Sequence, residues 1–60
     1  MFSVTDAVTK NEVYIAPQHV VAVFEIVEGE HAGKTGVNLI NGSIICIEDP
    51  QYIAEQVYND

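Results

Sequence analysis

The fold of this chain follows from residues 35–48, TGVNLINGSIICIE. The dipeptide Asn41-Gly42 lies between two runs rich in apolar and β-branched residues. Asn-Gly is a strong hairpin signal, because both residues tolerate the positive φ of a tight two-residue turn. Strands are therefore predicted at 35–40 and 43–48, with Asn41-Gly42 as the turn between them.

This turn also predicts which residues share a face of the sheet. It places Ile40 opposite Ser43 and Val37 opposite Cys46, and directly opposed residues lie on the same face. One face then carries Val37, Leu39, Ile44 and Cys46, and the other carries Gly36, Asn38, Ile40, Ile45 and Ile47. Apolar side chains are thus expected on both faces of the hairpin.

Three further strands are predicted from alternation and from β-branched and aromatic residues, at 2–5, 12–15 and 20–28, with Pro17 ending the second. The third is the longest. It would place Val20, Ala22, Phe24 and Ile26 on one side, and Val21, Val23, Glu25 and Val27 on the other. It is therefore also apolar on both sides.

One helix is predicted at 50–58. Asp49 is a good N-cap, and Pro50 suits the first helical position. Ile53 and Val57 lie one turn apart, so that one face of the helix can dock on the sheet. Nine helical residues can cover one face of a sheet and leave the other face open.

These elements predict a mainly β fold in a single domain over 1–60. It is a small, strongly bent antiparallel sheet or SH3-like barrel of four or five strands with one C-terminal α-helix. Strands that are apolar on both faces are normally covered on both. The leftover stripe of Val21, Val23 and Val27 is therefore expected to be a contact surface; the alternative is that these are scattered surface valines, which are ordinary.

The composition excludes several functions. The chain has nine carboxylates, two lysines and no arginine, with a formal net charge of −7. It is poorly equipped to bind nucleic acid, nucleotides or anionic membranes directly. The single cysteine, Cys46, lies in an apolar run and is expected to be a buried thiol. No cofactor, metal ion or catalytic residue is expected, because His19, His31 and the carboxylates match no ligand spacing. A cytoplasmic protein that is not an enzyme is predicted.

Residues 26–37, IVEGEHAGKTGV, resemble the KOW motif of SH3-like barrels in transcription elongation factors and ribosomal proteins. The resemblance covers about residues 20–40. It implies a small barrel that binds RNA or protein, with Gly29, Gly33 and Gly36 in the loop that joins two twisted strands. Nucleic-acid binders of that family are basic, whereas this chain has only Lys10 and Lys34. The same segment misses the phosphate-binding P-loop, which needs a glycine at position 28 and a helix after Thr35.

A looser similarity links the chain to FlbD-type short proteins of flagellar operons. It runs through residues 11–20, 39–44 and 53–57: a strand with a Tyr-Ile-x-Pro end, an Asn-Gly hairpin and a C-terminal helix. The similarity implies the same order of elements and transfers no site residues.

The function expected from the sequence is a non-catalytic protein-interaction module, self-associating and accessory or regulatory in role. The alternative is an acidic inhibitor of the phage type, acting in the host cytoplasm, that imitates nucleic acid and occupies a basic protein. Binding residues are expected among the apolar stripe and the acidic side chains: Val21, Val23, Val27, Glu25, Glu28, Glu30, Glu48 and Asp49. Loop geometry is expected to depend on Gly29, Gly33, Gly36, Asn41 and Gly42.

Overall fold

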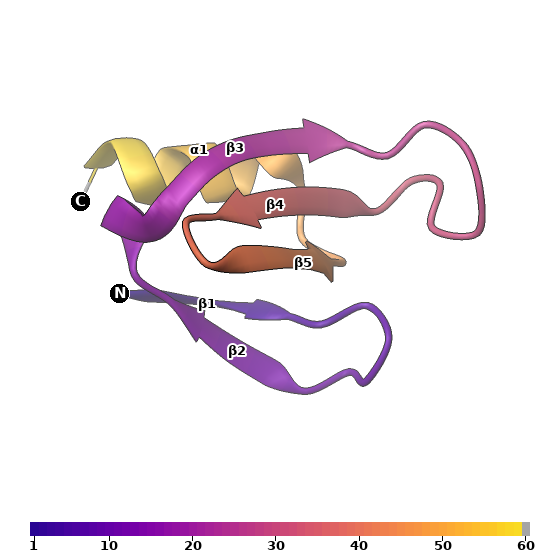
Figure 1. The fold of residues 1–60 in the computed structure, drawn as a ribbon, viewed down its shortest axis with the longest axis horizontal. Helices are drawn as coiled ribbons and strands as arrows, with labels where there is room; N and C mark the ends of the chain where they lie inside the picture. The colour runs from indigo at the N-terminus through magenta and orange to yellow at the C-terminus, as the bar shows by residue number, and fades with distance from the viewer. Residues whose placement is uncertain (60) are drawn as a thin grey trace.

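The computed structural model describes residues 1–59, so the last residue of the predicted 1–60 domain lies outside the described residues. Within these residues the chain has five strands, a short 3-10 helix between β2 and β3, and one α-helix at the C-terminal end (Figure 1). The elements are β1 (Phe2–Thr5), β2 (Glu12–Ile15), η1 (Pro17–His19), β3 (Val20–Glu25), β4 (Thr35–Leu39), β5 (Gly42–Cys46) and α1 (Pro50–Asn59).

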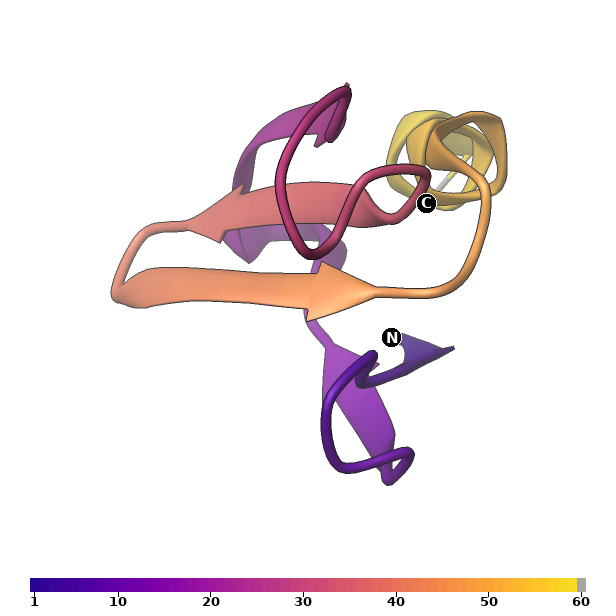
Figure 2. The ribbon, with the colours of Figure 1, turned by 90° about the vertical axis from the view of Figure 1, so that its right-hand side faces the viewer.

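The strands form two antiparallel sheets, which confirms the predicted mainly β class. One sheet pairs β1 with β2, and the other has the order β3-β4-β5. A single bridge between Asp6 and Cys46 joins them. Two backbone hydrogen bonds lie beside it: Ala7 N–H donates to the Ile45 carbonyl at 2.8 Å, and Ile47 N–H donates to the Thr5 carbonyl at 3.1 Å. In Figure 2 the β1–β2 pair lies below the larger sheet and crosses its strand direction.

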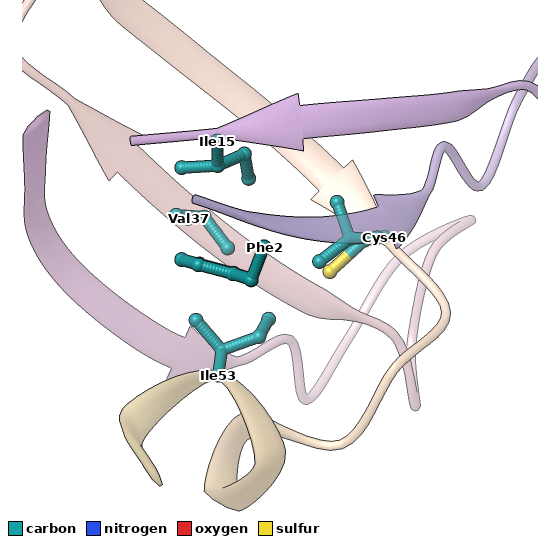
Figure 3. Packing of buried hydrophobic residues seen from close by; sticks show 6 residues of the cluster. Phe2, Ile15, Val37, Cys46 and Ile53 are labelled. Atoms are coloured by element: carbon teal, nitrogen blue, oxygen red, sulfur yellow. The ribbon is translucent and has the colours of Figure 1, made fainter. Parts of the chain in front are cut away.

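One apolar core lies between the two sheets and α1. Figure 3 shows side chains from five different elements meeting there. The cluster consists of Phe2, Val4, Ile15, Val37, Cys46 and Ile53, each at most 7% exposed. Because a 60-residue chain buries little surface, this small cluster supplies most of the hydrophobic stabilisation.

The C-terminal helix begins where the sequence predicts and ends one residue later, at Asn59. The Asp49 carboxylate caps it by accepting a hydrogen bond from the Gln51 N–H at 3.1 Å. Ile53 is fully buried and Val57 packs beside the core cluster, as the one-turn spacing predicts.

The hairpin forms one position earlier than predicted. Its turn residues are Ile40 and Asn41, and Leu39 lies opposite Gly42, so Val37 faces Ile44 instead of Cys46. This register differs by two residues from the predicted one. Side chains alternate with period two, so the predicted faces hold for the residues within β4 and β5, although every predicted pair is wrong; Ile40 and Ile47 lie outside the two strands.

β3 is shorter than the predicted strand 20–28 and ends at Glu25. The chain turns back at the next residue: Ile26 N–H donates to the Lys34 carbonyl at 3.0 Å, and the Ile26 carbonyl accepts from Gly33 N–H at 2.8 Å. Val27 and Glu28 therefore lie in the loop before β4.

The β1–β2 turn is held by the Asp6 carboxylate. Its Oδ1 accepts hydrogen bonds from Val8 N–H at 2.8 Å and Thr9 N–H at 3.0 Å. These bonds, first that from Thr9 and then that from Val8, lower the pKa of Asp6 below 3.8. A lowered folded-state pKa means that the ionised carboxylate stabilises the fold.

We expect Asp6→Asn to remove a pH-dependent contribution. The Asp6 contribution is fully present above the unfolded-state pKa of 3.8 and is lost as the pH falls through the lower folded-state value. The measurement is the free energy of unfolding of the wild type and the variant across the acid range. Their difference should shrink as the pH falls; a pH-independent difference would contradict the role given to Asp6.

Candidate functional site

The larger sheet leaves one of its faces uncovered within the described chain. In Figure 1, α1 lies behind β3 and β4, and no other element crosses the side of these strands that faces the viewer. The register places two rows of residues on this side. We call them the open face: Ala22, Asn38 and Ser43 in one row, and Phe24, Gly36 and Ile45 in the other.

Phe24 is the largest side chain of the open face. Its ring lies directly over Gly36: a Cβ atom added to this glycine would clash with Cζ and Cε2 of Phe24. Gly36 is thus needed for the close approach of an aromatic ring and not, as predicted, for a positive φ in the loop. The glycine allows the ring to lie close to the sheet, but the Phe24 side chain remains 46% exposed.

The predicted valine stripe does not form one surface. A β-bulge lies between Val20 and Ala22, and Val23 pairs with Val37 of the core. Because the bulge adds one residue, Val20 and Val23 both pack against the core cluster, while Val21 and Val27 are 66% and 81% exposed. Alternation grouped Phe24 with Ala22 correctly but also with Val20, which the bulge places on the core side beside Val23, so alternation alone did not identify Phe24 as the exposed residue.

A shallow groove runs between β3 and α1. Its volume is about 280 Å³. The lining residues are Val20, Val21, Ala22, Val23, Ala54, Val57 and Tyr58. Tyr58 is 90% exposed. Ala54 and Tyr58 are the exposed helical residues of this groove. The sequence pattern did not indicate them as site residues, because their role depends on the position of β3.

The predicted acidic residues gather at one end of the larger sheet. Glu25, Glu48 and Asp49 line a second hollow of about 340 Å³, together with Gly33, Thr35, Ile47 and Pro50. Glu28 and Glu30 are exposed in the adjoining loop. We call these five carboxylates the acidic end.

Glu48 differs from the other members of the acidic end, because its carboxylate is engaged within the fold. Oε1 accepts a hydrogen bond from Thr5 N–H at 2.8 Å, and Oε2 accepts one from the Thr5 hydroxyl at 3.0 Å. The buried Thr35 hydroxyl donates to the Glu48 carbonyl at 2.5 Å. Glu48 therefore ties β1 to the segment between β5 and α1.

The loop glycines divide into two groups. Gly29 and Gly33 have φ of 92° and 89°, as predicted for the loop between twisted strands. Gly42 has a φ of 153°. Asn41 does not have a positive φ; among the described non-glycine residues, Lys10 alone does. Of the two residues of the Asn-Gly dipeptide, Gly42 therefore has the predicted positive φ but begins β5, and Asn41 lies in the turn without one.

The thiol of Cys46 is fully buried, and burial, the largest influence, raises its pKa. Its environment is that of a core residue. Within residues 1–59, no group of three or more His, Cys, Asp or Glu side chains could hold a metal ion. In the same part of the chain, no helix is long and apolar enough to cross a membrane.

The surfaces that could bind a partner are therefore the open face, the β3–α1 groove and the acidic end. The resemblances to KOW-motif barrels and to FlbD-type proteins remain expectations from the sequence. Comparison with protein-family models, curated proteins and solved structures found no match for this chain.

Proposed function

We propose that this protein is a non-catalytic protein-interaction module that self-associates through the open face. The observation that carries the proposal is the position of Phe24, which lies on an uncovered sheet face and is 46% exposed. A face with an aromatic anchor and a neighbouring isoleucine, Ile45, is suited to a contact with another protein surface. A second copy would supply the cover that this chain is too short to provide.

The charge distribution favours a second copy as the partner. The chain carries a net charge of −7, so two copies repel each other unless they meet away from their carboxylates. The six residues of the open face include no charged side chain. Two such faces can meet about a two-fold axis without a like-charge contact, whereas a basic partner would gain little there.

We expect Phe24→Lys to disrupt self-association. It places an ammonium group at the centre of the proposed contact, and loss of an aromatic anchor there should weaken the dimer by more than about tenfold. The measurement is sedimentation equilibrium at tens of micromolar, with circular dichroism to verify folding. The control is Tyr14→Lys, because Tyr14 is 65% exposed on β2 and lies outside the open face.

The wild type and Tyr14→Lys should sediment as dimers, and Phe24→Lys as a monomer. A monomeric wild type at this concentration would overturn the self-association proposal. Equal dimerisation of all three proteins would place the contact elsewhere.

The acidic end supports a second candidate, inhibition of a nucleic-acid-binding protein by imitation of its ligand. Four of its members (Glu25, Glu28, Glu30 and Asp49) are exposed at one end of the molecule. A complex between these carboxylates and a basic protein should weaken steeply with added salt. Self-association through the uncharged open face should be unchanged or strengthened by salt, because salt screens the repulsion between copies.

A further inference from the structure

The β3–α1 groove is bounded by the edge of a strand and not by its face. Four consecutive residues of β3 line it, from Val20 to Val23. Because successive side chains point to opposite faces of a sheet, four consecutive residues can border one groove only along the strand edge. In the larger sheet β3 is the outermost strand, with β4 as its one strand neighbour in the part of the chain described.

Backbone groups of β3 face this edge. The N–H and C=O of Ile26 both bond to the chain that leads into β4. The N–H and C=O of a residue point to the same side of a strand, and the side alternates along the chain. The backbone groups of Val23 and Glu25 therefore point away from β4. After the bulge, Ala22–Glu25 is a regular edge on which about four residues can pair.

The opposite wall of the groove comes from the end of α1. Ala54, Val57 and Tyr58 follow the i, i+3, i+4 spacing and lie on one helix face. The groove volume of about 280 Å³ is below the range of roughly 300–1,000 Å³ typical of sites for small organic ligands. It suits a few small apolar side chains.

The charges around the groove favour a cationic occupant. Glu25 lies at the end of the edge, and Glu55 is exposed on α1 beside Ala54. The last turn of α1 contains no basic residue, so its partial negative charge is not offset by a lysine or histidine of that turn. The two lysines of the chain, Lys10 and Lys34, lie in other loops and do not line the groove.

We propose that the groove binds an extended peptide segment of a partner protein, added as a further strand beside β3. Its backbone pairs with the outward groups of Val23 and Glu25, its small β-branched side chains face α1, and lysine or arginine residues flank it. This site uses the outer edge of β3 and not the sheet face, although it shares Ala22 with the open face, so it does not depend on self-association.

The test titrates the full chain with an acetylated and amidated peptide of alternating valine and threonine, flanked by lysines. Amide chemical shifts should change in residues 21–25 and 54–58. A peptide of the same apolar sequence flanked by glutamates should bind at least about tenfold more weakly, because its charges repel those of the protein.

Two variants at one position separate backbone pairing from charge. Glu25→Pro removes the N–H that points away from β4. It leaves the hydrogen bonds between β3 and β4 intact, so an edge strand should tolerate this substitution. This variant should bind the lysine-flanked peptide more than about tenfold more weakly than the wild type does. Glu25→Gln keeps the N–H and should weaken binding about two- to fivefold. Val21→Lys, which changes a 66% exposed side chain of the groove, should also abolish binding and covers the case in which Glu25→Pro fails to fold.

Equal peptide binding by Glu25→Pro and Glu25→Gln, with both variants folded, would overturn strand addition. Shifts confined to residues outside the groove would overturn the site. Shifts at Val21, Val23 and residues 54–58 that grow with protein concentration alone would show that a second copy occupies the groove, which also overturns the proposal. Sedimentation equilibrium without peptide reports the dimer, and the amide shifts report the peptide site, so failure of the dimer and failure of the peptide site are distinguishable.

Discussion

Ile53→Ala should lower the free energy of unfolding by about 3 kcal/mol, the largest effect expected of any substitution proposed for this protein. Ile53 is fully buried and is the residue of α1 that belongs to the core cluster. Truncation removes three carbon atoms from the core cluster that Ile53 shares with Phe2, Val37 and Cys46, and leaves a cavity between the helix and the sheets (Figure 3).

The loss is large relative to the stability available. The free energy of unfolding of a domain of this length is roughly 3–9 kcal/mol, at about 0.05–0.15 kcal/mol per residue. A ten-residue helix is marginal in water without tertiary contacts, so α1 should lose most of its helicity when the anchor is removed. The melting temperature should fall by about 12–24 °C.

The measurement is urea unfolding followed by far-ultraviolet circular dichroism, at one fixed protein concentration for all variants because self-association would add to stability. Tyr58→Ala is the matched control. It truncates a larger side chain of the same helix, but Tyr58 is 90% exposed and its loss should change stability by less than about 0.5 kcal/mol. Equal losses for the two variants would contradict the anchoring role of Ile53.

Glu48→Ala should lower the free energy of unfolding by about 2 kcal/mol. The substitution removes both acceptors of Thr5, whose N–H and hydroxyl bind the two carboxylate oxygens. Hydrogen bonds to a charged acceptor are worth more than neutral ones, and this pair joins β1 to the segment that leads into α1.

The matched control is Glu28→Ala, the same substitution at an exposed loop carboxylate. Both changes reduce the net negative charge equally, so any general relief of self-repulsion cancels in the comparison. Thr5→Val keeps the backbone donor and removes the hydroxyl. It should lower the free energy of unfolding by about half as much as Glu48→Ala does. If Glu28→Ala and Glu48→Ala unfold at the same urea concentration, Glu48 is a surface charge as the sequence analysis supposed.

The hairpin shows how far local sequence patterns reach. The apolar pattern of residues 35–48 correctly predicts two strands and the faces of their side chains, because face membership depends only on alternation. The pairing depends on which two residues form the turn. The observed turn begins at Ile40, whose N–H donates to the His19 carbonyl at 3.0 Å. That partner lies 21 residues away along the chain.

β3 shows where alternation fails. One extra residue between Val20 and Ala22 places Val20 and Val23 on the core side and Phe24 on the open side. The predicted sides hold for Ala22–Glu25, whereas Val20 moves to the side of Val23 because of the bulge, and Val27 lies beyond the end of the strand. A bulge has no dependable signature in a run of valines, because each of these residues fits either side of a sheet.

Local features of the amino-acid sequence are enough to specify the mainly β class, the bounds of β1 and β2, the start of α1 with its Asp49 cap, and the net charge of −7. These properties depend on local propensity and alternation, which can be recognised within a few residues, and on composition. Three other features became known from the folded chain: the five strands divide into two sheets, Phe24 lies over Gly36, and Glu48 binds Thr5. These depend on contacts between residues 12 to 43 positions apart, and no local pattern encodes which distant partner the chain brings to them.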